Sequence, residues 1–336
     1  MLKCINLSLS NRCNANCIWC PIDRGTKHNY DLSFESIVKI IEEVSDPSFP
    51  HKLEMIHISE NGEALYHPEF LKIVRYIKQT LPDVPLNFLS NFGLLTPEIS
   101  KALLKEKLLS SVQVNIDGHD EESYRAVKGI SFKSVIKNVK HFLDMREKYD
   151  PEFDFCINVM PAFEYAVTVK TLFNTRPDRI TSDTDISFST FAETEKMLRE
   201  FVPNNVRIRH SKPGLWSERK KIHSGVMKFP GDVSQLTCPM IERVKTEAYI
   251  APNGDWYACC LDDNNDLVLG NINDQSILEI CNSEVRKEFI RKLENKEFAN
   301  IGYPCSAIAA CQIVGLPENI YKDMTTDIPL GTKIKF

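Results

Sequence analysis

The sequence predicts an α/β fold, a partial (β/α)6 barrel followed by a small C-terminal domain made of a hairpin and helices. Two observations predict it. Strand-like segments alternate with helical patterns over the first two thirds of the chain, and a cysteine-rich region with a hairpin signal follows them. Strands separated by helices form right-handed crossovers and therefore a parallel sheet. We place the barrel at residues 1–215, a linker at 216–237, the C-terminal domain at 238–315 and a tail at 316–336.

Short apolar or alternating segments define the strands of the barrel. They occupy residues 5–9, 55–58, 86–89, 112–116, 155–159 and 206–208. Helical spacing of apolar residues occurs between them, at 33–44, 68–80, 96–104 and 135–145, and Ser33 and Thr96 are expected to be N-caps. Residues 161–205 fit neither pattern and are expected to form an elaborated connection. Ligands of parallel sheets bind at the carboxyl ends of the strands, so the loops after these strands are the candidate sites.

The last third of the chain predicts a hairpin, because Asn253-Gly254 separates two strand-like segments. Two short helical patterns follow at 276–281 and 283–293. A unit of this size has little apolar core of its own, so a metal centre would help to hold it together.

Composition excludes several classes of protein. The 336 residues are 43% apolar and 26% charged, which is typical of a globular chain and not of a disordered or collagen-like one. The net charge of −5 disfavours nucleic acid as the main partner. The signatures GxGxxG, GxxxxGK[ST], HExxH and GxSxG do not occur. With no run of 18 apolar residues and no signal-peptide pattern, we expect a cytoplasmic protein with no membrane partner.

Cysteine usage indicates two metal centres. Disulfides are rare in a reducing compartment, so eleven cysteines in a cytoplasmic chain favour metal ligation. One group lies near the N-terminus and the other in the last third of the chain. Cys4, Cys156 and Cys281 are expected to be core residues instead.

The N-terminal group, Cys13, Cys17 and Cys20, follows the first predicted strand directly. A structural zinc site needs four ligands, and His28 is the only histidine near these three cysteines. Three thiolates match a [4Fe–4S] cluster with one open iron. The spacing therefore favours iron–sulfur over zinc, and zinc over three merely buried thiols.

These cysteines, with Trp19 before the last of them, resemble the CxxxCxΦC motif of the radical S-adenosylmethionine (radical SAM) family, whose fold is a partial TIM-like barrel. Three further segments resemble family motifs in the same order. Asn61-Gly62-Glu63-Ala64 resembles the Gly-Glu-Pro segment with Ala in place of Pro, Ser90-Asn91 resembles the Thr-Asn-Gly segment, and Asn115-Ile116-Asp117-Gly118 resembles a Ser-Leu-Asp-Gly stretch. The resemblance implies that the cofactor is bound by Trp19, Gly62, Glu63, Ser90, Asn91, Asn115, Asp117 and Asn158.

The resemblance implies reductive cleavage of S-adenosylmethionine at the three-cysteine cluster. The open iron chelates the amino and carboxylate groups of S-adenosylmethionine, and one electron from a flavodoxin- or ferredoxin-type donor breaks the sulfonium bond. The resulting 5′-deoxyadenosyl radical takes a hydrogen atom from an unactivated C–H bond, while the protein orients the substrate and excludes water.

The C-terminal cysteines resemble a reduced form of the family's auxiliary-cluster domain, the twitch variant of the SPASM domain. Gly302 stands where the full domain has the first cysteine of a CxxC pair. The resemblance implies one auxiliary [4Fe–4S] cluster held by Cys238, Cys259, Cys305 and Cys311. Cys259 is preferred to Cys260 because of its spacing from the hairpin glycine, and strand alternation lets only one of the two be a ligand. Two roles of this cluster are considered: electron transfer, and a purely structural role in holding the small domain together.

The segment after the last predicted strand contains Arg207, Arg209, His210, Trp216 and Arg219. Its His-Ser…Ser-x-Arg pattern is similar to a stretch in twitch-bearing radical SAM dehydrogenases that oxidise an aminocyclitol alcohol. The similarity implies that Arg219 and His210 are catalytic, with Arg219 holding the substrate oxygen through charge-assisted hydrogen bonds.

Three functions are therefore weighed. The first is oxidation of a sugar or aminocyclitol alcohol with the auxiliary cluster as electron acceptor. The second is maturation of a peptide by epimerisation, cross-linking or decarboxylation, in which Cys260 or Cys281 would donate hydrogen to an epimerised carbon. It is disfavoured because the predicted barrel begins at residue 3, without a peptide-recognition domain before it. The third is a zinc-held binding scaffold without enzymatic activity.

Overall fold

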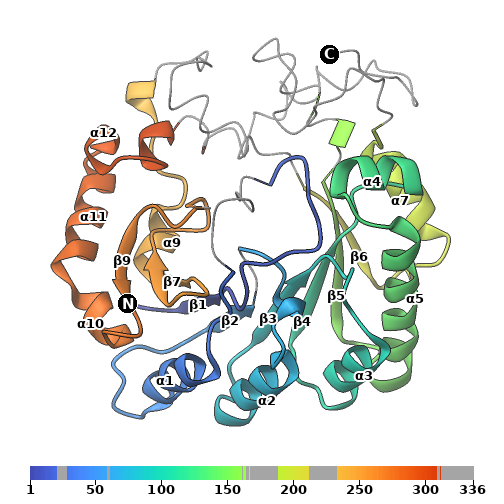
Figure 1. The fold of residues 1–336 in the computed structure, drawn as a ribbon, viewed down its shortest axis with the longest axis horizontal. Helices are drawn as coiled ribbons and strands as arrows, with labels where there is room; N and C mark the ends of the chain where they lie inside the picture. Colours follow the sequence, from blue (N-terminus) through green and yellow to red (C-terminus); the bar gives the residue numbers. More distant parts are fainter. Residues whose placement is uncertain are drawn as a thin grey trace.

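The computed structural model describes residues 1–20, 29–58, 61–160, 162–163, 166, 188–211, 233–262, 264–308 and 311. The strands in these residues form one nine-stranded sheet in the order β6-β5-β4-β3-β2-β1-β7-β8-β9, which curves around the centre of the molecule (Figure 1). The predicted α/β fold is confirmed.

The first six strands are parallel to their neighbours and form the partial barrel. They are β1 (Cys4–Leu7), β2 (Met55–Ile58), β3 (Leu86–Ser90), β4 (Ser111–Asn115), β5 (Asp154–Val159) and β6 (Arg207–His210). Each overlaps a predicted strand, and the differences lie at the ends, where sequence patterns carry the least information.

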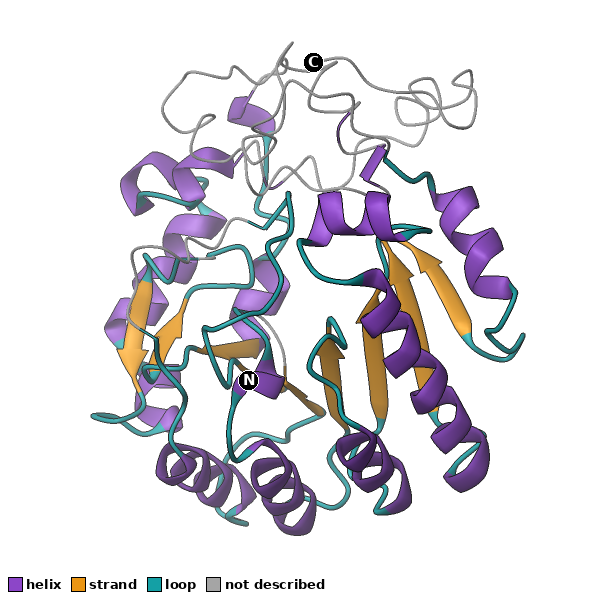
Figure 2. Cartoon of the chain, turned by 45° about the vertical axis from the view of Figure 1, so that its right-hand side comes forward, coloured by secondary structure: helices purple, strands orange, loops and turns teal. Residues whose placement is uncertain are grey.

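Helices cover the outer face of this sheet, except for α4 (Glu121–Lys128), which lies at the carboxyl end of the strands (Figure 1, Figure 2). The others are α1 (Phe34–Ser45), α2 (Phe70–Thr80), α3 (Pro97–Lys105), α5 (Phe132–Tyr149) and α7 (Phe191–Arg199). Ser33 and Thr96 accept hydrogen bonds from the backbone of the first turns of α1 and α3, as predicted caps should. The pattern analysis did not identify α4, because its sequence is mostly polar.

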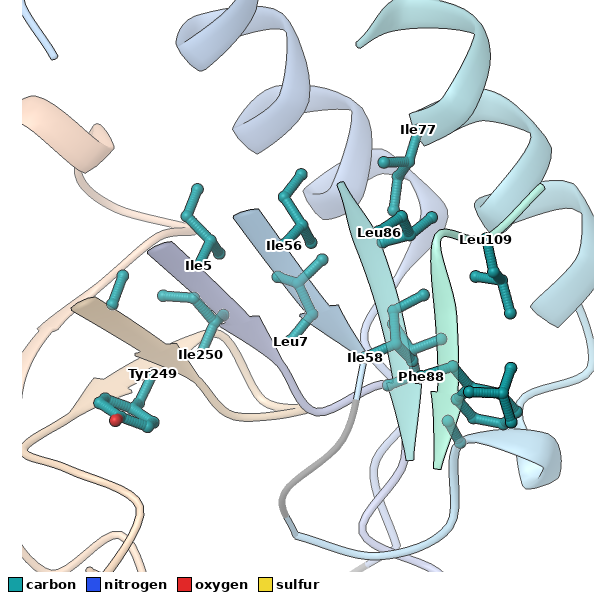
Figure 3. Close-up of a cluster of buried hydrophobic side chains, with 14 of the residues drawn as sticks. Ile5, Leu7, Ile56, Ile58, Ile77, Leu86, Phe88, Leu109, Tyr249 and Ile250 are labelled. Atoms are coloured by element: carbon teal, nitrogen blue, oxygen red, sulfur yellow. The ribbon is translucent and has the colours of Figure 1, made fainter. Parts of the chain in front are cut away.

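The two faces of the sheet differ in chemistry. Ile5, Leu7, Ile56 and Phe88 lie in the core between the strands and the outer helices (Figure 3). Successive side chains of a strand point to opposite faces, so the residues between them face the inside of the barrel. Several of these inward residues are polar: Asn6, His57, Asn87, Gln113 and Asn158. The barrel interior is therefore a surface suited to hydrogen bonding.

The C-terminal hairpin is present where Asn253-Gly254 predicts it. Strands β7 (Glu247–Ile250) and β8 (Asp255–Tyr257) are antiparallel, and Gly254 has φ +89°, a conformation that favours glycine. The sequence did not predict β9 (Val268–Asn271), nor that β7 pairs in parallel with β1. The C-terminal domain thus continues the sheet of the barrel.

The rest of the C-terminal domain packs short helices beside this hairpin: α9 (Ile241–Thr246), α10 (Ile277–Asn282), α11 (Glu284–Glu294) and α12 (Phe298–Ile301), with 3-10 turns at Val233–Gln235 and Cys305–Ala307. Cys4, Cys156 and Cys281 are buried, as expected of core residues. In the part of the chain that the structure describes, no helix is long and apolar enough to cross a membrane.

Candidate active site

The loop after β1 carries Cys13, Cys17 and Cys20 and lies at the carboxyl end of the sheet (Figure 1). Its backbone is attached to the last turn of α4, where Asn16 N donates to Lys128 O at 2.7 Å and Ile18 N donates to Val127 O at 3.0 Å. The loop therefore has a fixed path, although it belongs to no helix or strand.

The apolar side chains and the cysteines of this loop differ in solvent exposure, as expected for a loop that holds a cluster with one open iron. Ala15, Ile18 and Trp19 are buried, whereas the three cysteines are only half-buried. The loop thus turns its apolar side chains into the protein and leaves its thiols at the surface of the site. The burial of Trp19 supports a packing role beside its predicted place in the motif.

The Gly62-Glu63 segment is pressed against the cysteine loop. Gly62 has φ +108°, and a Cβ on it would lie 2.0 Å from Ser10 O, which is far inside van der Waals contact. Glu63 N donates to Arg12 O at 2.8 Å. The two segments that the sequence identified separately are therefore neighbours, and only glycine allows their close approach.

Glu63 is 3% exposed, and its carboxylate accepts hydrogen bonds from Ser90 Oγ at 2.8 Å and Asn91 N at 2.8 Å. Burial raises the pKa of this carboxyl, and the hydrogen bonds from Asn91 and Ser90 only partly oppose the rise. An ionised Glu63 would be more stable with a cation beside it. The ammonium group of an amino acid is such a cation.

Asn91 supports the cysteine loop directly. Its Nδ2 donates to Asn14 Oδ1 at 2.8 Å and lies 3.6 Å from Cys13 Sγ, while its Oδ1 accepts from Gly93 N at 2.7 Å. Hydrogen bonds to sulfur ligands are one means by which proteins adjust iron–sulfur clusters. The residue predicted to bind cofactor therefore positions the first cysteine.

Asp117 forms a buried ion pair that the sequence analysis missed. Its carboxylate lies 2.9 Å from Lys128 Nζ, and both side chains are at most 3% exposed. Burial alone would lower the pKa of Lys128, but the charges of Asp117 and Cys17 hold it well above its ordinary value. Asp117 Oδ1 also accepts from Met160 N at 2.8 Å. The pair lies next to the cysteine loop, whose Asn16 N donates to Lys128 O. Lys128 precedes the glycine that ends α4, a position at which the sequence does not indicate a buried lysine.

Asn115 and Asn158, at the ends of β4 and β5, contact each other: Asn158 Nδ2 donates to Asn115 Oδ1 at 3.1 Å. Arg209 on β6 joins them, since its Nε donates to Asn158 Oδ1 at 3.0 Å. The predicted pair is therefore brought together on the inner face, with Arg209 as a third member.

His210 lies on the opposite face of β6 from Arg209. It is in register with the core residue Val159, and its ring stacks on Phe191 of α7 with centroids 4.6 Å apart. The structure does not bring His210 to the inner face of the barrel. Trp216 and Arg219, like His28, lie outside the described residues.

A second group of thiols forms in the C-terminal domain. Cys259, Cys305 and Cys311 are buried, and no disulfide joins any of the eleven cysteines, all of which the structure describes. Burial raises the pKa of Cys259 well above its usual range, and the nearby thiols of Cys260, Cys305 and Cys311 raise it further. These thiols therefore lie close enough to Cys259 to interact with it electrostatically, although Cys311 is 52 positions from Cys259 in the sequence.

Cys260 and Cys238 differ from this group. Cys260 is half-buried, and Arg243 Nη1 lies 3.6 Å from its sulfur. Cys238 is also half-buried, and burial raises the pKa of its thiol. Cys259 is thus the more buried of the two adjacent cysteines.

Neither thiol group is drawn together around a single ion. Among the described residues, no three His, Cys, Asp or Glu side chains converge closely enough to hold one metal ion.

Family models match two segments of the chain. Residues 7–150 match the radical SAM superfamily, and residues 238–311 match SPASM, an iron–sulfur cluster-binding domain. The chain therefore contains a radical SAM domain and a SPASM domain. A radical SAM domain uses S-adenosylmethionine with a [4Fe–4S] cluster, and the SPASM domain brings auxiliary iron–sulfur clusters.

Solved structures share the fold. Native anSMEcpe with bound AdoMet is 13% identical with a TM-score of 0.58, and 97% of each chain is covered. BtrN in complex with AdoMet and 2-DOIA is 14% identical with a TM-score of 0.51, covering 89% of this chain and 90% of BtrN. Streptococcus suis SuiB bound to its precursor peptide SuiA is 13% identical with a TM-score of 0.55, covering 92% of this chain and 71% of SuiB.

Curated relatives match over shorter spans. GTP 3′,8-cyclase of Petrotoga mobilis is 24% identical over 145 residues, which are 42% of this chain and 43% of the relative. The tungsten-containing aldehyde ferredoxin oxidoreductase cofactor-modifying protein of Pyrococcus furiosus is 30% identical over 102 residues, which are 30% of this chain and 27% of the relative. The chain thus matches less than half the length of these relatives.

Proposed function

We propose that this radical SAM enzyme oxidises an alcohol carbon of a sugar or aminocyclitol to a ketone and passes one electron to a single auxiliary cluster. The observation that carries the proposal is the continuity between the two cysteine-bearing units. β7 pairs with β1, and Asn61 Nδ2, beside the Gly62-Glu63 segment, donates to Asn265 Oδ1 of the C-terminal domain at 2.9 Å. These contacts attach the C-terminal domain to the edge of the first site, which supports electron transfer between the two units over a purely structural role for the auxiliary cluster.

The ligand sets follow from the residues. Cys13, Cys17 and Cys20 would hold the cluster that binds S-adenosylmethionine, and Cys238, Cys259, Cys305 and Cys311 the auxiliary one. When bound, the cofactor and its cluster supply a 5′-deoxyadenosyl radical that removes one hydrogen atom from the substrate.

Glu63 holds the methionine amino group in this proposal. Its carboxylate oxygens already accept from Ser90 and Asn91, but an ionised carboxylate has about four acceptor positions, so an ammonium donor can still be added. The buried Asp117–Lys128 pair and Asn91 keep the cysteine loop in position. Arg219 is proposed to hold the substrate oxygen; His210, which stacks on Phe191, would have to act from the outer face.

The reaction balances with two electrons and two protons removed from the alcohol. The carbinol carbon would lose a hydrogen atom, and the hydroxyl would lose a proton to solvent or to a base. The auxiliary cluster, when held by Cys238, Cys259, Cys305 and Cys311, would supply the acceptor for the remaining electron. The hydroxyl would lose its proton before the electron leaves, because a negatively charged oxygen makes the carbon radical a much stronger reductant. A guanidinium at that oxygen stabilises the developing charge in a site without water.

The test separates hydrogen abstraction from electron transfer. Anaerobically reconstituted enzyme is incubated with dithionite, S-adenosylmethionine and candidate cyclitols and sugars, and ketone and 5′-deoxyadenosine are quantified. Cys305→Ala or Cys311→Ala should abolish the ketone while 5′-deoxyadenosine continues to form. Cys281→Ala, a buried cysteine outside the thiol group, is the matched control and should retain both products. Ketone formation by the Cys305 and Cys311 variants would disprove electron transfer to the auxiliary centre.

Peptide maturation is the second candidate, favoured by one observation. Cys260 is a half-buried thiol beside Arg243 and next to the auxiliary group, where it could donate a hydrogen atom to a peptide carbon. Conversion of a peptide to an epimerised, cross-linked or decarboxylated product, with no alcohol oxidised, would establish this function in place of the first. Loss of epimerisation in Cys260→Ala with continued 5′-deoxyadenosine formation would then identify the donor.

A further inference from the structure

Four side chains at the carboxyl ends of three adjacent strands form what we call the amide wall: Gln113 and Asn115 of β4, Asn158 of β5 and Arg209 of β6. Asn115, Asn158 and Arg209 occupy one register row of the sheet, and Gln113 lies one inward-facing position earlier on β4. The wall faces the inside of the barrel, because Ile157 and Val159, on the alternate positions of β5, are buried in the outer core.

The orientation of every amide in the wall is determined by Arg209. A guanidinium can only donate, so the atoms that face it, Asn158 Oδ1 at 3.0 Å and Gln113 Oε1 at 3.0 Å, must be oxygens. The nitrogen of Asn158 is then turned toward Asn115, whose facing atom must also be an oxygen, at 3.1 Å.

The consequence is a surface with its acceptors occupied and its donors available. Asn158 Oδ1 accepts from Arg209 and from Ser211, and Asn115 Oδ1 accepts from Asn158 and, at 3.5 Å, from Gln113. Among the described residues, Asn115 Nδ2 donates to nothing and Arg209 retains N–H groups beyond the two it uses. Such a wall is complementary to a group that only accepts hydrogen bonds.

The charge of Arg209 also favours a ligand that accepts hydrogen bonds. Arg209 has no carboxylate partner among the described residues, and neutral amide oxygens are its only contacts there. Arg207, two positions earlier on the same strand and face, is instead paired with Asp154 through both carboxylate oxygens at 2.9 and 3.0 Å. Within the described residues, Arg207 is thus paired with a carboxylate and Arg209 is not, and Arg209 lies at the carboxyl end of the strand, where ligands of parallel sheets bind.

We infer that the Arg209 end of the amide wall is a substrate subsite for an oxyanionic group, a carboxylate or a phosphate, with Arg209 as its anchor. Asn115 and Asn158, which the family resemblance assigns to the cofactor, orient this end of the wall through their hydrogen bonds. The inference rests on the proposed function in that the same molecule carries the alcohol that is oxidised. Arginine suits this role because its planar fork matches the oxygens of both anions. The substrate is then an acidic or phosphorylated sugar-like alcohol, and a cationic aminocyclitol is disfavoured.

The experiment measures binding and needs no turnover. Reconstituted enzyme, without reductant and with saturating S-adenosylmethionine so that the site for the cofactor's own carboxylate is filled, is titrated calorimetrically with four probes. They are glucose 6-phosphate, glucuronate, glucose and glucosamine. Wild type is compared with Arg209→Gln and with Arg207→Gln, the matched control from the same strand, and the affinity for S-adenosylmethionine is measured for all three.

We expect glucose 6-phosphate or glucuronate to bind about 10- to 100-fold more tightly than glucose, as a charged hydrogen-bonding group predicts, and the tighter of the two identifies the anion. Arg209→Gln should remove this preference and Arg207→Gln should keep it. Equal binding of neutral and anionic probes, binding of none of them, or a preference that survives Arg209→Gln would overturn the inference. An equal loss of S-adenosylmethionine affinity in Arg209→Gln would assign the wall to the cofactor and overturn it too. A failure of ketone formation alone would instead refute the oxidation and leave the anion preference standing.

Discussion

Glu63 shows how a buried charge can mark a cofactor site. The carboxylate is held by Ser90 and Asn91, residues from a different strand end, yet these bonds do not compensate for its loss of water. Proteins retain such groups where a ligand completes their environment. The methionine ammonium of S-adenosylmethionine would complete it here.

Replacing Glu63 by Ala should therefore weaken S-adenosylmethionine binding. The loss of a hydrogen bond to a charged group is worth about 1.5–3 kcal/mol, or about a 10- to 100-fold rise in Kd. Equilibrium binding to reconstituted protein measures it. Glu69→Ala is the control, because the side chain of Glu69 is 42% exposed and forms an ion pair with the neighbouring Lys72. An unchanged Kd in Glu63→Ala would show that Glu63 does not contact the cofactor.

At the scale of elements, α4 connects the sheet to the cysteine loop. Its last turn accepts the backbone N–H groups of Asn16 and Ile18, and its last residue, Lys128, extends to Asp117 after β4. The loop can hold its shape without regular secondary structure because these bonds fix it at both the backbone and the side-chain level.

Breaking the Asp117–Lys128 pair should loosen this loop. Lys128→Met leaves a buried unpaired carboxylate, which costs about 3–5 kcal/mol. We expect a lower thermal midpoint and faster loss of iron from the first cluster to a chelator, followed by absorbance. Arg125→Met, which removes an exposed pair with Glu121 on the same helix, should change neither quantity.

A double variant, Asp117→Leu with Lys128→Met, tests the cause. It removes both charges, so it should recover part of the stability that Lys128→Met loses. A double variant that is less stable than the single one by the sum of two independent losses would contradict the pairing.

At the scale of the whole molecule, one sheet carries two cysteine-held units. β1 leads to the first thiol group, and the hairpin of β7 and β8 leads to Cys259 of the second. The thiols of the two units come from separate segments of the chain, so either cluster should assemble without the other.

The triple replacement of Cys13, Cys17 and Cys20 by Ala should therefore leave roughly half of the iron and sulfide of the reconstituted wild type, consistent with independent cysteine-held sites. Iron analysis and electron paramagnetic resonance of the reduced protein measure this. Cys4→Ala together with Cys156→Ala provides a control for cysteine loss in the core. Complete loss of iron in the triple variant would refute two independent sites.

Local sequence determined much of this protein by itself. Features that depend on neighbours a few residues away can be predicted from the sequence. They are the strands of the barrel, the caps Ser33 and Thr96, the hairpin turn at Gly254 and the three N-terminal cysteines. The strand period of two also places His210 on the same face of β6 as Ile208, away from the barrel interior.

Tertiary structure alone decided the rest. The parallel pairing of β7 with β1 places Glu247 opposite Cys4 in the sheet. Lys128 pairs with Asp117 because α4 packs back against the end of the sheet. The donor-rich amide wall exists only because three strands align Asn115, Asn158 and Arg209 in one row. These features depend on contacts between segments far apart in the chain. No local pattern encodes such contacts, because the free energy that selects them comes from burial and hydrogen bonding in the assembled fold.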